Sequence, residues 1–441
     1  MTTTPSPERR YKRLSPLTPL VRSFIFLVAV VASSWRELLQ GDLGPFGWIL
    51  LGLVAAGAAY GTASWLRTKY WIEDDELRVD TGVISRQSRR IRVDRLQGID
   101  IKQPLAARVF GLAELKMDVA GGGRAEGSLA FLPLKEAQDL RELLLARRDA
   151  VKRGPAPSPD DLWPVQPPKP APAPDRVLAR LDLGMLLVSL VLAGETFGFI
   201  ISALVFSAIF AIVGSFAGAS SILPVVLGFA FAFGRKFAAF YNFTVSTTPS
   251  GLQVRRGLLE LNTQTIALHR VQGVVVVEHW AWRLLGWARL DVSVAGYGKG
   301  TGEVDKPTES VVLPVGTRAQ VRELAQHLLS GLDPTAVDLV PAPRRARWAA
   351  PFWWRFLAAG VGEEVVASRN GLLTRRTHIA PHARVQSLRL HQGPWQRLLG
   401  LADVHVDSPP GPVRVRAKHR AVAEARELLD REDALAEAAR H

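Results

Sequence analysis

Apolar residues are concentrated in a few long runs along the chain. In residues 183–234 the only charged residue is Glu195. A helix that crosses the hydrocarbon core of a bilayer needs about 20 mostly apolar residues, so this run is long enough for two. Its best division is a short interfacial helix over 183–194, followed by spans near 196–216 and 222–240. The pattern therefore predicts a transmembrane hairpin here.

A similar pattern occurs earlier in the chain. Apolar runs cover about residues 21–39 and 43–66, and a Leu-Gly-Pro-Phe-Gly sequence beginning at Leu43 supplies the turn. The first run has no small-residue cleavage pattern and a second run follows at once, so we interpret it as an uncleaved helix. The hydrophobic pattern thus predicts four transmembrane helices in two hairpins, as in an integral membrane protein.

Glu195 is the one acid within the second apolar region. An acid inside a membrane segment often marks an ion or proton path. Burial at the bilayer centre is costly, however, and a position at an interfacial bend avoids that cost. We favour the bend, and an ion or proton role stays open.

The distribution of basic residues predicts the orientation. Five lysines and arginines lie at or before the start of the first span, and two follow each of the second and fourth spans. The loops inside the two hairpins carry one or none. Cytoplasmic flanks of membrane proteins are enriched in these residues. We therefore expect a multi-pass protein of the cell membrane, with both termini and all large polar segments in the cytoplasm.

The polar segments contain three copies of one pattern. When the copies are aligned on one glycine, the same residue types recur 13, 15, 26 and 29 positions later without a gap. The aligned glycines are Gly82, Gly257 and Gly371; the recurring residues are Arg95, Arg270 and Arg384, then Gln97, Gln272 and Gln386, then Arg108, Arg283 and Arg397, and finally Gly111, Gly286 and Gly400. Such internal repetition predicts one domain used three times.

Each copy has the pattern of a small β-domain. Short β-branched runs alternate with polar residues, and the aligned glycine predicts a tight hairpin with positive φ. Each copy closes with an apolar periodicity typical of a helix, over 134–147, 317–329 and 418–438. We predict a membrane α + β fold, in which three β-barrels, each capped by a C-terminal helix, accompany the two hairpins.

These elements define the domain organisation. The predicted parts are a basic N-terminus (1–20), hairpin 1 (21–66), β-domain 1 (67–153), a proline-rich linker (154–175), an interfacial helix with hairpin 2 (176–240), β-domain 2 (241–335), and β-domain 3 with a basic aromatic lead-in segment (336–441).

The repeated residues carry a resemblance to a known family. The order is a hydrophobic hairpin, a strand pair ending at the glycine, an Arg-Leu/Val-Gln strand and an Arg-x-x-Gly segment. The chain resembles the bacterial pleckstrin-homology-like membrane proteins of the YdbS/YdbT type over nearly its whole length outside the linker. The resemblance implies a PH-like barrel in each copy and suggests envelope homeostasis or stress resistance, but it implies no enzymatic activity. The third copy departs from the pattern because it lacks a hairpin.

Composition narrows the set of partners. The chain has no cysteine, which excludes disulfides, thiolate catalysis and Cys-ligated metal sites. Its net charge of +14 and pI of about 10.4 indicate an anionic partner. Beside predicted membrane segments, anionic lipid is a simpler partner than nucleic acid, which we do not expect.

Two groups of residues are candidates for binding. The Arg-x-Gln pairs can hold an anionic headgroup, since arginine binds phosphate in bidentate fashion, or they can hold the fold through backbone carbonyls; these residues are Arg95, Gln97, Arg270, Gln272, Arg384 and Gln386. The segment that replaces the third hairpin can lie in an anionic interface or cover the barrel; its residues include Arg344, Arg345, Arg347, Trp348, Trp353, Trp354 and Arg355.

The sequence gives little support for metal binding or catalysis. His378 and His382 are four residues apart, but Pro381 lies between them and no carboxylate helper is nearby, so we expect no metal site. We find no catalytic motif and expect neither a cofactor nor an enzyme. The expected function is a membrane scaffold or adaptor that binds lipid headgroups, protein partners or a shorter PH-like membrane relative, with oligomers an open question. The alternative is a small transport or lipid-handling protein.

Overall fold

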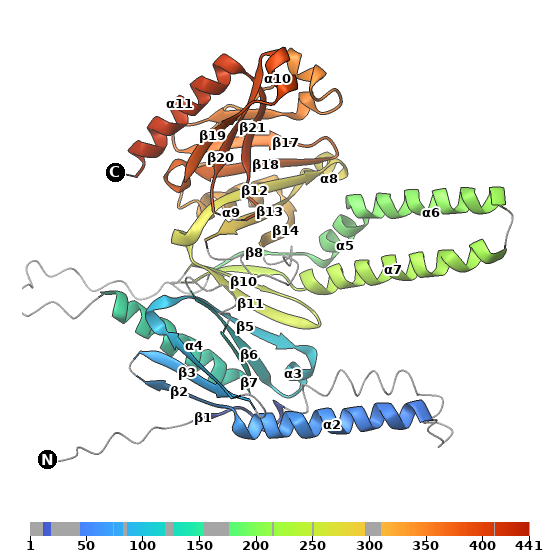
Figure 1. The fold of residues 1–441 in the computed structure, drawn as a ribbon, viewed down its shortest axis with the longest axis vertical. Helices are drawn as coiled ribbons and strands as arrows, with labels where there is room; N and C mark the ends of the chain where they lie inside the picture. Colours follow the sequence, from blue (N-terminus) through green and yellow to red (C-terminus); the bar gives the residue numbers. More distant parts are fainter. Residues whose placement is uncertain are drawn as a thin grey trace, which may run out of the picture. The chain divides into compact units, whose positions relative to one another are not determined.

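Each of the three copies folds into the same order of strands and helices (Figure 1). The computed structural model describes residues 12–18, 45–73, 75–82, 86–119, 127–153, 176–213, 216–248, 251–295, 310–409 and 411–440. The chain forms two compact units: residues Met1–Pro170 with Leu259–Gln264, and Ala171–Leu258 with Thr265–His441. The predicted helix over 21–39 and the proline-rich linker lie outside the described residues.

Repeat 1 contains seven strands. The first sheet has β1 (Lys12–Arg13), β2 (Lys69–Glu73), β3 (Glu76–Thr81) and β4 (Gln87–Arg92) in that order. The turn η1 (Val93–Arg95) leads to β5 (Leu96–Pro104), α3 (Leu105–Val109), β6 (Leu112–Val119), β7 (Gly127–Pro133) and the closing helix α4 (Leu134–Arg153). Helix α2 (Pro45–Arg67) enters between β1 and β2.

Repeat 2 follows the same plan. Its strands are β8 (Val177–Arg180), β9 (Thr244–Thr248), β10 (Gly251–Arg256), β11 (Glu260–Ile266), β12 (Val271–His279), β13 (Trp287–Val294) and β14 (Val311–Thr317). The turn η3 (Leu268–Arg270), the short helix α8 (Trp280–Leu285) and the closing helix α9 (Arg318–Leu328) occupy the places of η1, α3 and α4. Helices α5 (Leu183–Val191), α6 (Gly194–Val213) and α7 (Phe216–Phe240) enter between β8 and β9.

Repeat 3 differs only in what enters after its first strand. Two short turns, η4 (Arg344–Trp348) and η5 (Trp354–Phe356), replace the helices of the earlier repeats. The other elements are β15 (Val340–Pro341), β16 (Ala358–Val361), β17 (Val365–Asn370), β18 (Thr374–Pro381), η6 (His382–Arg384), β19 (Ser387–His391), α10 (Pro394–Leu399), β20 (Leu401–Asp407), β21 (Val415–Ala421) and α11 (Val422–Ala438).

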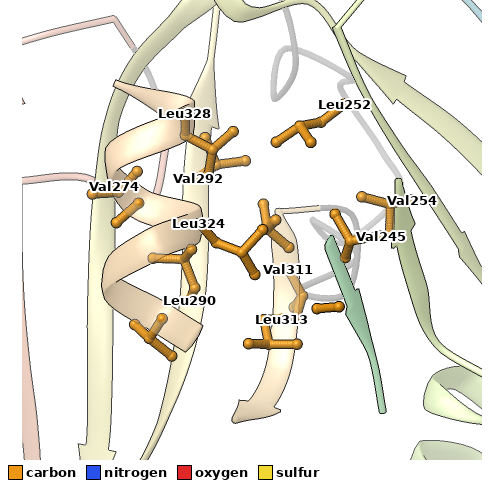
Figure 2. Close-up of a cluster of buried hydrophobic side chains, with 14 of the residues drawn as sticks. Val245, Leu252, Val254, Val274, Leu290, Val292, Val311, Leu313, Leu324 and Leu328 are labelled. Atoms are coloured by element: carbon orange, nitrogen blue, oxygen red, sulfur yellow. The ribbon is translucent and has the colours of Figure 1, made fainter. Parts of the chain in front are cut away.

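The core of repeat 2 lies between a first group of strands (β9 and β10), a second group (β12, β13 and β14) and the closing helix α9 (Figure 2). Strand residues point alternately to opposite faces, so every second side chain can enter the core. The buried side chains drawn there are Val245, Leu252 and Val254 from the first group, Val274, Leu290, Val292, Val311 and Leu313 from the second, and Leu324 and Leu328 from α9. Full burial of one such side chain contributes about 1.5–3 kcal/mol. The apolar face of the closing helix therefore packs on the strands, as the apolar spacing predicted.

The two glycines of each repeat have a common backbone role. Gly82, Gly257 and Gly371 have φ of 114°, 113° and 98°, which L-residues with a Cβ rarely adopt. Gly111, Gly286 and Gly400 have φ of 66°, 69° and 64° and end the short helices α3, α8 and α10. The carbonyls of these three accept the first backbone N–H of the closing helix, at 3.0, 3.0 and 3.2 Å. The repeat signature thus includes the turns that set the direction of the chain.

Strand pairing continues from one repeat into the next. In the second unit, β18 of repeat 3 pairs with β12 of repeat 2 in the sheet β14-β13-β12-β18-β17-β16-β15. In the first unit, residues 260–263 of β11, which belong to repeat 2, pair with β5 of repeat 1. Both pairings are antiparallel. We call such a pairing a repeat joint.

The two repeat joints share one register. Asn262 lies opposite Lys102, and Arg376 lies opposite Val277. In both pairs, a residue five positions after its repeat glycine faces one 20 positions after the glycine of the preceding repeat. Register is set by which side chains must face a core, so the same repeat reproduces the same register.

The prediction of transmembrane hairpins is wrong for this structure. Within the part of the chain that the structure describes, no helix combines the length and the apolar content that crossing a membrane requires. The apolar run 183–234 is divided among α5, α6 and α7, and α7 also carries Pro224, Arg235 and Lys236. The predicted orientation rested on these spans and stays a prediction.

Candidate functional site

The arginines of the Arg-x-Gln pairs contact backbone carbonyls in the second unit. Arg384 lies in η6, and its Nη2 donates a hydrogen bond of 2.8 Å to the carbonyl oxygen of His269, in η3 of repeat 2. Arg270 donates through Nη2 to the carbonyl of Ala295 in its own repeat. Arg95 of repeat 1 is exposed, and within the described ranges its side chain has no hydrogen bond or ion pair. One signature residue therefore has three different environments.

The glutamines differ in the same way. Gln272 is buried, and its Nε2 donates to the carbonyl of Arg270 at 3.1 Å. Gln386 is exposed, and its backbone N–H donates to the carbonyl of Asp407 at 2.9 Å. The side chain of Gln97 lies outside the described part. The observed contacts are those that hold the fold, and a headgroup role for these pairs stays a prediction.

The arginine of the Arg-x-x-Gly segment also reaches across a repeat joint. Nη2 of Arg283 donates to the carbonyl of Leu372 at 2.9 Å, directly after the hairpin glycine of repeat 3. The backbone N–H of Trp280 donates to the carbonyl of Leu373 at 2.7 Å. The sequence showed that this arginine recurs in every copy but not that it joins two repeats; the available signal was its strict spacing from the repeat glycine of each copy.

The segment that replaces the third hairpin exposes both cations and rings. Its alanines, Ala346 and Ala350, are buried, which turns the remaining side chains outward. Trp348, Phe352 and Trp353 are 63%, 74% and 53% exposed. The four arginines Arg344, Arg345, Arg347 and Arg355 are exposed as well. We call these seven residues the Arg–Trp surface.

Two arginines of this segment lie over indole rings. The guanidinium carbon of Arg347 is 5.1 Å from the ring centroid of Trp348, and that of Arg355 is 5.5 Å from that of Trp354. Trp354 itself is half-buried against Ala342, Leu357 and other apolar residues. Trp354 therefore anchors the segment, whereas the other rings face outward. Cation–π contacts of this kind leave the arginine N–H groups available to anions.

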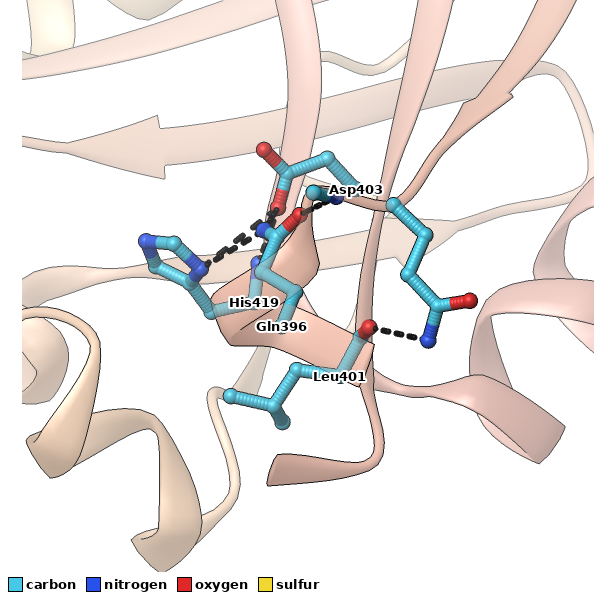
Figure 3. Close-up of polar contacts among 6 residues, drawn as sticks. Gln396, Leu401, Asp403 and His419 are labelled. Atoms are coloured by element: carbon cyan, nitrogen blue, oxygen red, sulfur yellow. Dashed lines mark hydrogen bonds and ion pairs between the residues drawn. The ribbon is translucent and has the colours of Figure 1, made fainter. Parts of the chain in front are cut away.

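Helix α10 extends the Arg–Trp surface. Nε1 of Trp395 donates to the carbonyl of Trp348 at 3.1 Å, and both Trp395 and Leu398 are exposed. A polar network fixes α10 to β20 and β21 (Figure 3). Nε2 of Gln396 and the backbone N–H of His419 each donate to Oδ1 of Asp403, both at 2.7 Å. Hydrogen bonds therefore hold α10, with its exposed Trp395 and Leu398, against β20 and β21.

The two histidines that are four residues apart have separate protein partners. Nδ1 of His378 accepts a 3.2 Å hydrogen bond from the backbone N–H of Arg414. Burial, with the nearby charges of Arg376, Arg414 and Arg416, lowers the pKa of His378 to about 4. His382 is buried and lies 2.8 Å from Oε1 of Glu432. Among the described residues, no three His, Asp or Glu side chains are grouped as a metal site would require.

Comparison with known proteins agrees with the repeat structure. The family model described as "Bacterial PH domain" matches residues 23–148, 186–332 and 339–435, one segment for each repeat and together most of the chain. The chain belongs to the bacterial PH domain family. The family resemblance expected from the repeated residues is confirmed, and the PH-like domains of this family member are present three times.

One curated relative of this bacterial PH domain protein is the UPF0699 transmembrane protein YdbT of Bacillus subtilis (strain 168). It is 25% identical over 314 residues, which are 66% of this chain and 61% of the relative. The match therefore spans less than two thirds of the relative. No solved structure matches this bacterial PH domain protein significantly.

Proposed function

We propose that this bacterial PH domain protein is a non-enzymatic scaffold that docks on an anionic membrane surface through its third repeat. The Arg–Trp surface carries the proposal. Exposed arginines beside exposed indole and phenyl rings suit the boundary between headgroups and acyl chains, because cations meet phosphates while the rings enter the interface. Rings so exposed are costly in water and need an apolar partner.

Two further observations support a membrane surface. Helices α2, α6 and α7 also expose large apolar side chains, among them Leu53, Leu204 and Phe231 at 64%, 65% and 68%. The relative YdbT is named a transmembrane protein. We infer that the exposed apolar helices contact lipid, at the cell membrane and with the PH-like domains on its cytoplasmic side.

The scaffold part of the proposal comes from the architecture. Three PH-like domains on one chain offer repeated surfaces, and several weak contacts to protein partners sum to useful avidity. Within the described residues, the buried ionisable groups are held by partners of the fold, such as His382 with Glu432.

Vesicle flotation of the full-length protein tests the lipid contact. We compare wild type with a triple variant, Arg344→Gln, Arg345→Gln and Arg347→Gln. Both are tested on neutral vesicles and on vesicles that contain about 30 mol% phosphatidylserine. Each arginine near an anionic surface contributes about 1 kcal/mol, so the triple variant should bind anionic vesicles roughly a hundredfold more weakly.

The matched control removes the same charge elsewhere. Arg322, Arg426 and Arg431 are exposed on the closing helices α9 and α11, away from the Arg–Trp surface in sequence. Their replacement by glutamine should leave binding nearly unchanged. Equal loss in both triple variants would show that only net charge matters and would contradict docking through the Arg–Trp surface.

A further inference from the structure

Two of the described strands have an edge without a described partner, where their counterparts in the other repeats are paired. Strands β11 and β18 pair with the preceding repeat, but β4, their equivalent in repeat 1, pairs only with β3 among the described strands. Strands β5 and β12 pair with the following repeat, but β19, their equivalent in repeat 3, pairs only with β20 in the described part of the chain. Among the described strands, β4 and β19 therefore each lack the pairing to another repeat that their counterparts have.

Near the same two strands, the signature arginines have side chains without a partner among the described residues. At the joint between repeats 2 and 3, Arg384 reaches back to the carbonyl of His269, and Arg283 reaches forward to the carbonyl of Leu372. Arg95 is the counterpart of Arg384 in the first of the three repeats, and Arg397 is the counterpart of Arg283 in the third. Both are exposed, and their side chains have no hydrogen bond or ion pair to any described residue. Repeats 1 and 3 thus each carry the residues of a repeat joint at a strand with no partner from another repeat among the described residues.

We infer that β4 of one copy of this chain pairs antiparallel with β19 of a second copy, so that the protein assembles head to tail through a third repeat joint. The occupant of each open edge is the other end of an identical chain. Both internal joints already show that an N-terminal half of one repeat fits the C-terminal half of another. Unpaired strand edges are ready templates for such pairing.

The internal joints fix the register of this contact. Six positions after its glycine, Thr263 faces Ile101, and Thr377 faces Val276. The same rule places Ser88 of one copy opposite Leu390 of the next, and it places Gln87 opposite His391. By the same analogy with Arg384, the Arg95 guanidinium donates to the backbone carbonyl of Ala383 in the second copy.

Charged residues on β4 and β19 affect how strongly the two copies pair. The shared register sets Arg89 opposite Arg389, and like charges directly opposite one another weaken a strand pair. Arg389 is already bound by both carboxylate oxygens of Asp407, at 2.5 and 2.8 Å, which offsets part of the repulsion. The internal joints place opposite charges together, since Arg375 lies 3.6 Å from Glu278. We therefore expect assembly to be weak in wild type and adjustable at position 89.

Disulfide trapping tests the register, because the chain has no cysteine of its own. The full-length Ser88→Cys, Leu390→Cys variant is oxidised and run on non-reducing gels. Directly opposite residues lie within the range that a disulfide spans. We expect dimers and higher multimers that disappear on reduction, and neither single-cysteine variant should give them. In the control Ser88→Cys, Arg389→Cys, the two side chains point to opposite faces, so multimers should be rare.

Three results would overturn the inference. They are the absence of multimers in the folded Ser88→Cys, Leu390→Cys variant, a cross-link confined to the monomer, and equal multimers from the Arg389→Cys control. Sedimentation of cysteine-free protein gives a second measurement. Arg89→Glu should lower the concentration for half-assembly by about two- to fivefold, whereas Arg426→Glu on α11 should not; equal behaviour of the two variants would also contradict the inference.

Discussion

At the scale of single residues, glycine and arginine explain why three copies keep the same spacing. The hairpin glycines have positive φ, and at Gly371 an added Cβ would collide with the carbonyl oxygen of Thr374. The arginines instead reach carbonyls that lie in another repeat, as Arg283 and Arg384 show. A glycine requirement follows from local backbone geometry and can be read from sequence, whereas a carbonyl partner a hundred residues away cannot.

His378 gives the clearest pH dependence. Its pKa is about 4 in the folded protein because of burial and neighbouring arginines, whereas an unfolded histidine has a pKa of about 6.5. The unfolded state therefore binds the proton first, and the stabilisation is complete above pH 6.5 and is lost as the pH falls toward 4. Between pH 6.5 and 5 this group should cost about 2 kcal/mol.

Urea unfolding of the full-length protein at several pH values measures this effect. In His378→Gln the free energy of unfolding should fall less steeply between pH 6.5 and 5 than in wild type. His391→Gln, an exposed histidine on β19, serves as the matched control. If wild type and His378→Gln lose the same free energy over this range, the burial of a neutral His378 is wrong.

At the scale of elements, the strand pairing between repeats is the feature that sequence reasoning missed. The periodicity predicted strands and closing helices, and the strict spacing predicted three equal domains. It could not show that β18 pairs with β12, because both strands satisfy the same alternation whether they pair within one repeat or between two. The hairpin prediction is wrong because no helix among the described residues combines the length and apolar content that crossing a membrane requires.

The contact of Arg384 tests the repeat joint directly. Arg384→Ala removes a solvent-exposed hydrogen bond to the His269 carbonyl, which should cost about 0.5–1.5 kcal/mol. Arg95→Ala removes the equivalent residue where no described partner exists, so it should leave the free energy of unfolding nearly unchanged.

Hydrogen exchange resolved by segment locates the effect. In Arg384→Ala, amides of β12 and β18 should exchange faster, while those of β5 and β6 should keep their wild-type rates. Uniform acceleration over the whole chain, or equal effects of Arg384→Ala and Arg95→Ala, would show that this arginine does not act at the joint between repeats 2 and 3.

At the scale of the whole molecule, one PH-like unit has been used three times with a changing insertion after its first strand. In repeats 1 and 2 that insertion contains apolar helices, including α2, α6 and α7; in repeat 3 it is the pair of turns that forms the Arg–Trp surface. Sequence composition identified the arginines and tryptophans of that segment as candidates. It did not show that Trp354 turns inward while Trp348 and Trp353 face outward, because both orientations fit the same composition.

The most direct test of membrane docking is the environment of Phe352, the most exposed ring of the Arg–Trp surface at 74%. Since the chain has no cysteine, Phe352→Cys in the full-length protein accepts a single polarity-sensitive dye, and Gln386→Cys provides an exposed control in the same repeat. On phosphatidylserine vesicles, we predict a blue-shifted dye emission at position 352, no shift at position 386, and little shift at either position on neutral vesicles. A dye at position 352 that stays in a water-like environment while the protein is vesicle-bound would contradict docking through this surface.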